Sequence, residues 1–284
     1  MLLVAFCAPA SAATVDATAG IRFSAAAGEV NDLSVAFDDA VITFTDKSAT
    51  LTAGTDCRSV SAHVVNCAAT LGSTPSLQID LGDAADSVEV SGIAASVTGG
   101  AGNDLLSGSN DGDVLSGGSG DDIVKGRGGA DTMDGGDGED RIDYSERSKP
   151  VIVDLAAPDA AQGGIDENDL AKNFEQAYGG DAADVLEGDG HDNVLSGGDG
   201  ADRLIGRGGA DDLVGGSGRD TADYSERKDS VRLVIGAGPV SGGPLDGPAG
   251  ARDRIDASVE GLVGGSGGDV LIGGPSDNVL DGGP

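Results

Sequence analysis

The sequence predicts an all-β solenoid of nine-residue repeats, with a small β-module before the repeats and insertions between them. Five consecutive nonapeptides occupy residues 99–143, five more occupy residues 179–223, and two further units begin at Gly264 and Gly273. Every unit begins with glycine and has Asp or Asn at position six. Position eight is a large apolar residue in every unit except the one that contains Ala222. A short period that stays in phase over many units is the signature of a solenoid.

The first residues have the character of a secretory signal. Residues 1–13 are apolar, and Ala10-Ser11-Ala12 matches the small-residue cleavage motif of such segments. The usual positive charge at the start is missing, because the first basic residue is Arg22. We predict a partial signal peptide over residues 1–13, with Cys7 inside the removed segment. A short buried strand is the alternative.

Residues 14–76 lack the nonapeptide and predict a small β-module. Segments that alternate apolar and polar residues with the strand period of two are Ile21–Phe23, Leu33–Phe37 and Val41–Thr45, and Val60–Val65 is a further candidate strand. Asp38-Asp39 separates the second and third segments and predicts a hairpin turn. Because the open end of a solenoid invites edge-to-edge pairing, we interpret the module as an N-terminal cap.

Cys57 and Cys67 form an even pair within this module. In an exported chain such a pair predicts a disulfide. A Cys/His metal site is the alternative, since His63 lies between the two cysteines. The chain has only two histidines, however, which are too few ligands for such a site.

The repeat region covers residues 77–284 and begins with a degenerate coil at residues 77–89. Within that coil, Gly82–Asp86 has the same sequence as Gly180–Asp184. We therefore expect Asp86 to act as a first metal ligand.

Each nonapeptide divides into a turn, over positions one to six, and a short strand, over positions seven to nine. Glycine adopts positive φ without a Cβ clash, so glycines at positions one, two and four let successive carbonyl oxygens point into one concavity. The Asp at position six adds a carboxylate, and Ca²⁺ prefers hard oxygen ligands of both kinds. Because strand side chains alternate, position eight should face the core and positions seven and nine the solvent. A flexible Gly/Asp-rich linker is the alternative, but it has no reason to keep an apolar residue at every ninth position.

This pattern resembles the RTX family, whose haemolysin-type calcium-binding repeat has the consensus GGxGxDxUx. The resemblance covers residues 99–143, 179–223 and 264–284. It implies a parallel β-roll with two nonapeptides per coil, in which each ion lies between two turns on the same edge. The implied pairs of position-six residues are Asp104 with Asp122, Asp122 with Asp140, Asp113 with Asp131, Asp184 with Asp202, Asp202 with Asp220, and Asn193 with Asp211.

The turns and the degenerate coil together supply the predicted ligands for several Ca²⁺ ions. These residues are Asp86, Gly99, Gly100, Gly102, Asp104, Gly108, Asp111, Asp113, Gly117, Gly118, Gly120, Asp122, Gly126, Gly128, Asp131, Gly135, Gly136, Gly138, Asp140, Gly179, Gly180, Asp184, Gly188, Asp192, Asn193, Gly197, Gly198, Gly200, Asp202, Gly206, Gly208, Asp211, Gly215, Gly216, Gly218, Asp220, Gly264, Gly265, Gly267 and Asp269. Two units shift the carboxylate to position five, at Asp192-Asn193 and Asp277-Asn278.

Two insertions, residues 144–178 and 224–263, separate the repeat blocks and resemble each other. Matching residues are Tyr144 with Tyr224, Leu170 with Ile255, Phe174 with Val259, and Glu175 with Glu260. We interpret the insertions as wider coils of the same roll, with loops at residues 156–168 and 236–251. The two tyrosines should pack over the roll. For the two glutamates a structural hydrogen bond is favoured over metal ligation.

The chain of 284 residues is strongly acidic, with a formal net charge of −32, 50 glycines and 3% aromatic residues. Such a chain cannot bury a wide core, and it should resist compaction unless bound cations cancel its charge. We therefore expect folding to be coupled to calcium. The acidity argues against nucleic acid as a partner, and no apolar run reaches membrane-spanning length.

Motifs for catalysis are absent or accidental. No H-E-x-x-H motif occurs, and Gly264–Gly268 matches G-x-S-x-G only within a repeat turn, without the strand-to-helix context of a nucleophile elbow. We predict a secreted or cell-surface calcium-binding structural protein that is not an enzyme, with an unidentified cell-surface or extracellular-matrix partner. The alternative is the C-terminal-type calcium-binding part of an RTX-like exported enzyme or toxin whose catalytic region is absent.

Overall fold

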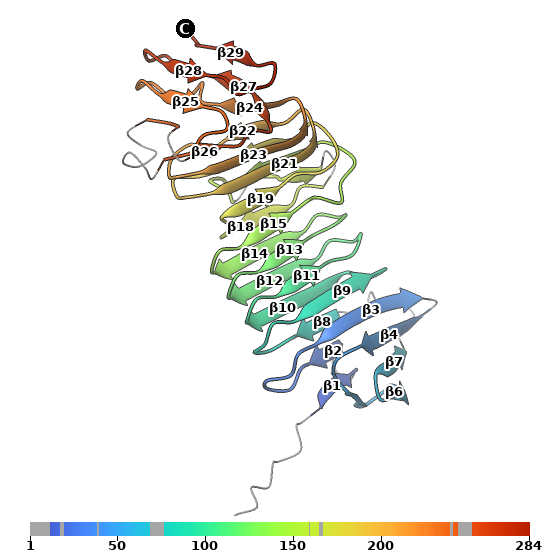
Figure 1. Cartoon of the computed structure of the whole chain (residues 1–284). Coiled ribbons are helices and arrows are strands. Elements are labelled where there is room, and N and C mark those ends of the chain that lie inside the picture. Colours follow the sequence, from blue (N-terminus) through green and yellow to red (C-terminus); the bar gives the residue numbers. More distant parts are fainter. Residues whose placement is uncertain are drawn as a thin grey trace, which may run out of the picture.

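A computed structural model describes residues 12–17, 20–38, 40–68, 77–158, 160–164, 167–238, 241–243 and 252–284. This described part consists of short strands and turns, without a helix, stacked into an elongated roll (Figure 1). The predicted signal segment lies almost wholly outside the described residues. Only Ala12 and Ala13 of that segment are described, and Ala13 opens the first strand.

The strands form two long sheets, a third sheet that begins partway along the roll, and a short fourth sheet. Sheet 1 has the order β18 (Leu170–Lys172), β14 (Thr132–Asp137), β12 (Val114–Ser119), β10 (Ala95–Ala101), β8 (Leu77–Asp80), β2 (Ile21–Ser24), β1 (Ala13–Asp16), β5 (Leu51–Ala53). Sheet 2 has the order β26 (Arg254–Ile255), β23 (Asp212–Gly218), β21 (Val194–Gly200), β19 (Gln176–Tyr178), β15 (Arg141–Asp143), β13 (Ile123–Lys125), β11 (Leu105–Ser107), β9 (Ser87–Ser91), β3 (Asp32–Asp38), β4 (Val41–Asp46), β7 (Val64–Ala68), β6 (Cys57–Ser61). Sheet 3 has the order β17 (Gly163–Gly164), β16 (Val151–Asp154), β20 (Val185–Glu187), β22 (Arg203–Ile205), β24 (Asp220–Asp223), β27 (Val259–Val263), β29 (Val279–Asp281). Sheet 4 pairs β25 (Arg232–Val234) with β28 (Val270–Ile272).

Successive coils are related by two nonapeptides, as the sequence predicts. Val124 on β13 is the parallel register partner of Leu106 on β11 and of Ile142 on β15. Alternate units therefore return to the same sheet, and the turns between them alternate between the two edges. The all-β parallel roll is confirmed.

Position eight forms the core of the roll. Its residues in both blocks are at most 1% exposed, and they are Leu106, Leu115, Val124, Met133, Ile142, Leu186, Leu195, Leu204, Leu213 and Ala222. Full burial of a Val, Leu, Ile or Met side chain contributes about 1.5–3 kcal/mol, so a thin core of two facing rows still stabilises the stack.

The prediction for the outward positions is only partly right. Position nine is buried at Ser107, Asp143, Ile205 and Asp223. The two aspartates begin the insertions, where the chain folds back over them. Asp143 Oδ1 accepts a hydrogen bond from Ser145 N at 2.9 Å, and Asp223 Oδ1 accepts one from Ser225 N at 2.7 Å.

The N-terminal module continues both long sheets. Strands β3 and β4 form the predicted antiparallel hairpin; Asp39, in its turn, lies outside the described residues. Strand β2 pairs in parallel with β8, and β3 pairs in parallel with β9, so the module is hydrogen-bonded directly to the repeats. The prediction of one strand over Val60–Val65 is wrong. A turn at Ala62 and His63 divides that segment between β6 and β7, because the chain reverses there into an antiparallel hairpin.

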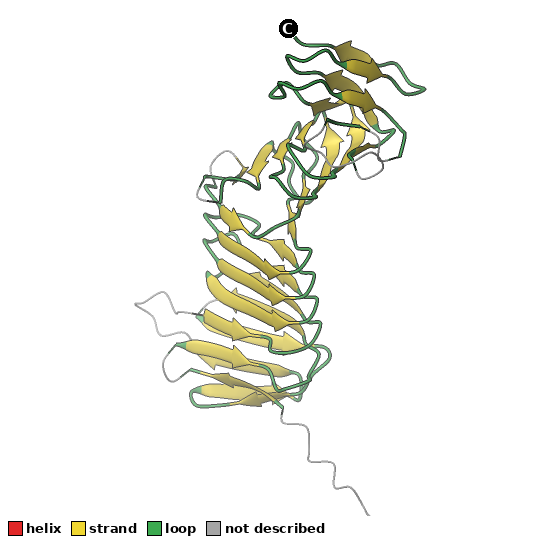
Figure 2. Cartoon of the chain, turned by 90° about the vertical axis from the view of Figure 1, so that its left-hand side faces the viewer, coloured by secondary structure: helices red, strands yellow, loops and turns green. Residues whose placement is uncertain are grey.

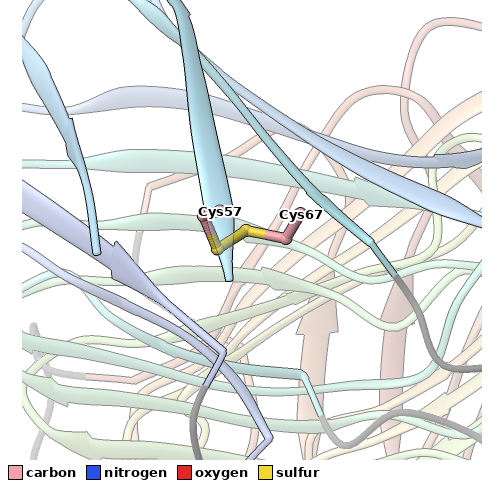
Figure 3. The surroundings of a disulfide bond; sticks show 2 residues. All are labelled: Cys57 and Cys67. Carbon is pink, nitrogen blue, oxygen red and sulfur yellow. A yellow bond between two sulfur atoms is a disulfide. The ribbon is translucent and has the colours of Figure 1, made fainter. Parts of the chain in front are cut away.

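Cys57 and Cys67 are cross-strand partners in that hairpin. Their sulfur atoms lie 2.04 Å apart, as a disulfide between β6 and β7 (Figure 3). The pairing matches the sequence prediction.

Each insertion ends one sheet and starts another, while the sheet on the opposite side of the roll continues. At the first insertion sheet 1 ends at β18 and sheet 3 starts with β17 and β16, whereas sheet 2 runs on through β15, β19 and β21. At the second insertion sheet 2 ends at β26 and sheet 4 starts with β25, whereas sheet 3 runs on through β24, β27 and β29. In the first insertion, the predicted loop at residues 156–168 contains β17; much of the predicted loop at 236–251 lies outside the described residues.

Sheets 1 and 3 cover the same face of sheet 2. The register partners Ile142, Ala177 and Leu195 on sheet 2 are all buried, so the inward face does not change across the first insertion. The side of the roll formed by sheets 1 and 3 carries β16 and β17 in addition to its one strand per coil. The added strands widen that side, and Figure 2 shows the stack changing direction between its lower and upper parts.

One sequence correspondence between the insertions is wrong. Ala171 pairs with Met133, and Ile255 pairs with Leu213, so Ala171 rather than Leu170 is the equivalent of Ile255. Leu170 is exposed. The pairing of β24 with β27 also contains a register shift, between Asp220 and Thr221.

Candidate metal centre

The position-six side chains form columns along the edges of the roll. The backbone N–H of each one donates to the side chain of the same-edge turn one coil later. These bonds run from Asp104 to Asp122 Oδ1 (2.8 Å), from Asp122 to Asp140 Oδ1 (2.8 Å), from Asp113 to Asp131 Oδ1 (2.8 Å), from Asp184 to Asp202 Oδ1 (2.8 Å), from Asp202 to Asp220 Oδ1 (2.9 Å) and from Asn193 to Asp211 Oδ1 (2.9 Å). The structure therefore brings all six predicted pairs together.

The columns extend beyond the repeats in the same geometry. Asp86 N donates to Asp104 Oδ1 at 2.8 Å, and Asp86 Oδ1 accepts from Asn31 N at 2.6 Å, so the degenerate coil is part of the column. Glu175 Oε2 accepts from Asp140 N at 2.8 Å, and Glu260 Oε2 accepts from Asp220 N at 3.0 Å. The two glutamates thus make the structural hydrogen bond that the sequence favours, in the place of a position-six aspartate.

Sequence reasoning missed two members of the columns, Asp169 and Asp253. Asp169 Oδ1 accepts from Asp131 N at 2.9 Å, and Asp253 Oδ1 accepts from Asp211 N at 3.0 Å. They lie in the insertions, outside any nonapeptide. The available signal is their spacing, because each precedes a buried apolar residue by two positions, as position six precedes position eight.

The second carboxylate oxygen of most column members is buried and has no hydrogen-bond partner among the described residues. These atoms are Oδ2 of Asp86, Asp104, Asp122, Asp131, Asp140, Asp202, Asp220 and Asp269. Asp113 and Asp184 differ, because their Oδ2 atoms accept from Ser109 N and Gly180 N, each at 2.6 Å. An unsatisfied buried acceptor costs about 1–3 kcal/mol, and more when it is charged, so a row of them calls for a cation.

With the exception of Asp86, whose turn has Leu81 at position one, each of these oxygens faces the position-one glycine of its own turn. A Cβ on Gly117 would overlap Asp122 Oδ2 and would lie 2.6 Å from the carbonyl oxygen of Gly135, which belongs to the next turn on that edge. The equivalent relation to the position-six side chain holds at Gly99, Gly108, Gly126, Gly179, Gly188, Gly197, Gly206, Gly215 and Gly264. Position one is therefore glycine because a carboxylate oxygen and a neighbouring carbonyl converge there.

The other predicted turn glycines set the backbone direction. Positive φ occurs at positions two and four, for example 121° at Gly118 and 122° at Gly120. In the two turns with arginine at position two, the residues with positive φ are Arg127 and Arg207 at position two and Gly129 and Gly209 at position four. The predicted ligands Gly128 and Gly208 lie at position three of these turns.

Two predicted ligands do not join the columns. Asp111 and Asp192 are exposed on the outside of their turns, whereas Asp113 and Asn193 hold the column positions. In the shifted unit, Asn193 Oδ1 accepts from Asp189 N at 2.8 Å. The amide rather than the neighbouring carboxylate is therefore built into the column.

The donor set of these edges is mixed. The described residues contain no group of three or more His, Cys, Asp or Glu side chains placed around one point. A cation held between two turns would therefore combine one or two carboxylates with backbone carbonyl oxygens. Such hard oxygen donors in an irregular arrangement fit Ca²⁺.

Burial raises the pKa of the column carboxyls. The pKa rises to about 6 for Asp104 and Asp140 and to about 7 for Asp131 and Asp202, with desolvation as the main cause and the neighbouring column carboxylates adding to it. The metal-free columns therefore resist full ionisation.

We expect the calcium-free fold to be more stable in mild acid than at neutral pH. A carboxyl with a raised pKa holds its proton more tightly in the folded state. Its contribution to stability is present below the unfolded value of 3.8 and is lost as the pH rises through about 6 to 7. Circular dichroism of decalcified protein during urea unfolding, at about pH 5 and about pH 8, measures this difference.

The β-signal of the calcium-free chain should survive more urea at the lower pH. With saturating calcium the order should reverse, because protons then compete with the metal for the carboxylates. Equal unfolding midpoints in the calcium-free samples would contradict the prediction.

A parallel β-roll with stacked carboxylates along its turns defines a class of repeat protein. A comparison with protein families matches the RTX calcium-binding nonapeptide repeat (4 copies) to residues 96–124, 107–142, 175–204, 187–222 and 262–284. Over these residues the chain carries the repeats of this family. A comparison with curated proteins finds no match.

Nowhere in the described part of the chain does a helix combine the length and apolar character needed to cross a lipid bilayer.

Proposed function

We propose that this protein is an exported calcium-binding repeat protein with a structural or cell-surface role, and that it folds on binding Ca²⁺. The observation that carries the proposal is the row of buried Oδ2 atoms without a hydrogen-bond partner among the described residues; within the nonapeptides, each lies beside the position-one glycine of its own turn. At Asp122 the carbonyl oxygen of the next turn converges on the same point. The family match to a calcium-binding repeat supports the same assignment.

The proposed ligands are the position-six carboxylates together with backbone carbonyl oxygens of the glycine turns. Asp104, Asp122 and Asp140 represent the first block, and Asp202 and Asp220 the second. The exposed carboxylates of Asp111 and Asp192 are left out of the set. When bound, the ion supplies positive charge between two turns; the chain supplies the oxygens and the hydrogen bonds that hold them.

Charge supports the coupling of folding to metal. The chain has a formal net charge of −32, and the columns place carboxylates one coil apart on the same edge. Each Ca²⁺ cancels two negative charges where the repulsion is greatest. Because the ligands converge only in the folded coil, the free energy of binding becomes free energy of folding.

A non-catalytic, extracellular role is the companion proposal. Extracellular calcium modules bind in the range of about 0.1–1 mM, which suits a chain that stays unfolded where calcium is scarce and folds where it is abundant. The disulfide between Cys57 and Cys67 also suits an oxidising environment.

Equilibrium dialysis with ⁴⁵Ca²⁺ at neutral pH tests the calcium assignment directly. We expect several ions per chain, with saturation near millimolar calcium. Excess Mg²⁺ should displace them poorly, because Mg²⁺ demands octahedral geometry and gives up its water reluctantly. Binding of no ions, or equal competition by Mg²⁺ at equal concentration, would reject the proposal.

A further inference from the structure

The two insertion tyrosines lie inside the roll and bond to column carboxylates. Tyr144 Oη donates to Asp169 Oδ2 at 2.9 Å, and Tyr224 Oη donates to Asp253 Oδ2 at 2.5 Å. Both rings are almost fully buried, with 2% and 3% exposure. The sequence predicts that the tyrosines pack over the roll; in the structure both rings pack within its hydrophobic core, and each hydroxyl has a buried carboxylate partner.

These bonds involve the carboxylate oxygen that most other column members leave unpartnered. In Asp122, Oδ1 accepts the N–H of Asp104, while Oδ2 has no hydrogen-bond partner among the described residues and faces the following turn. In Asp169, Oδ1 accepts the N–H of Asp131 in the same way, but Oδ2 accepts the tyrosine hydroxyl. The hydroxyl therefore occupies the side of the carboxylate where the following turn would lie.

Topology explains why the following turn is missing at these two aspartates. Asp169 directly precedes β18, which is the last strand of sheet 1, and Asp253 directly precedes β26, which is the last strand of sheet 2. An ion shared between two turns needs a turn on each side. Among the described residues, no further turn follows Asp169 or Asp253 in its column that could share an ion with it.

The same insertions provide an internal contrast. In each of them the opposite column continues, through Glu175 in the first insertion and Glu260 in the second. The aspartates that precede those glutamates, Asp140 and Asp220, keep a buried Oδ2 without a hydrogen-bond partner among the described residues. A tyrosine is found where a column ends, and not where it continues.

Arg147 reinforces the first of these column ends. Its guanidinium lies 2.8 Å from Glu167 Oε1, and Glu167 Oε2 accepts from Gly164 N at 2.7 Å. Arg147 and Glu167 thus form an ion pair near Asp169, in which the two opposite charges offset each other.

We propose that Tyr144 and Tyr224 close the metal columns by standing in for the ion, so that Asp169 and Asp253 are not calcium ligands. This inference rests on the proposed calcium function for the remaining turns. It assigns a specific role to the Asp-Tyr-Ser segment that starts each insertion. The hydroxyl satisfies the last carboxylate, and the calcium sites stop at that point.

A double-mutant cycle on Tyr144→Phe and Asp169→Asn tests whether the tyrosine hydroxyl takes the place of the ion at the end of the column. The two readouts are the number of ⁴⁵Ca²⁺ ions bound per chain and the melting temperature in saturating calcium. Both single variants should keep the wild-type number of ions. Each should lower the melting temperature by about 2–4 °C or more, because it leaves a buried partner unsatisfied. The double variant should lose less than the sum of the two singles, because the two groups act on each other.

Two variants serve as controls. Asp122→Asn, in a column that continues, should reduce the number of bound ions. Tyr178→Phe changes the remaining tyrosine, which is only half-buried, and should leave both readouts unchanged. If the first cycle yields unfolded protein, the same cycle on Tyr224 and Asp253 replaces it.

Loss of an ion in Asp169→Asn, or melting-temperature shifts of the two single variants that add up exactly in the double variant, would overturn the proposed closure by tyrosine. Either result would leave the calcium function intact. A chain that binds no calcium but still shows coupling between Tyr144 and Asp169 would overturn the calcium function and leave the hydrogen-bonded closure in place.

Discussion

Removal of calcium from the purified chain should abolish most of its β-structure at neutral pH. The columns hold buried carboxylates one coil apart, and a formal net charge of −32 opposes compaction of the whole chain. The core of position-eight side chains is thin, so in the metal-free roll the burial of apolar side chains offsets little of this repulsion. Circular dichroism during a calcium titration of chelator-treated protein should show β-structure returning at roughly 0.1–1 mM.

The N-terminal module gives this experiment an internal reference. Its strands are joined by an antiparallel hairpin and a disulfide rather than by Gly-Asp turns, and Phe23 stacks on Phe44 at 6.4 Å between ring centroids. A residual β-signal from residues 14–76 should therefore persist in chelator. A full β-rich spectrum that persists in excess chelator would contradict calcium-coupled folding of the repeats.

Asp122→Asn should reduce calcium binding more than any single substitution at the ends of its column. Asp122 lies between Asp104 and Asp140, and it bonds to the first through its Oδ1 and to the second through its N–H. The amide keeps the size of the side chain but removes its charge from the sites on both sides. Loss of a side chain that only hydrogen-bonds to a metal ligand weakens metal sites about 10–100-fold, and loss of a direct ligand should weaken both neighbouring sites at least as much.

Calorimetric titration of the Asp122→Asn protein with Ca²⁺ measures this effect. The matched control is Asp137→Asn, which removes the same charge from an exposed position three of a nearby turn. The control should show a small, salt-sensitive change. Equal losses in the two variants would mean that net charge rather than the column determines calcium affinity.

The sequence predicted the structure best at repeat positions that have the same type of residue and the same role in every unit. The burial of position eight follows from a period of nine that never slips, whereas the pairing of units two apart and the grouping of Asp104 with Asp122 were implied by the resemblance to the RTX family. The hairpin of β3 and β4 and the disulfide were equally accessible, because each depends on local alternation or on a single pair of cysteines. These features are local or strictly periodic, which is why a pattern of residue types predicts them.

The insertions were harder because their geometry depends on which sheet each strand joins. Nothing in the spacing indicates that β16 starts a new sheet or that the chain then turns back to add β18 to the old one. Asp169 was missed for this reason, since its role depends on lying beside Asp131 in space. The matching of Leu170 with Ile255 was wrong for the same reason, because a comparison of residue types along the sequence does not reveal which residues pair between strands.

The two insertions add strands on opposite sides of the roll. The first places β16 and β17 on the side of sheets 1 and 3, and the second places β25 on the side of sheets 2 and 4. Strands added on one side make that side of the stack longer than the other and so favour a change of direction. The number of repeats then sets the length of each arm, while the side on which an insertion adds strands sets the direction in which the next arm points.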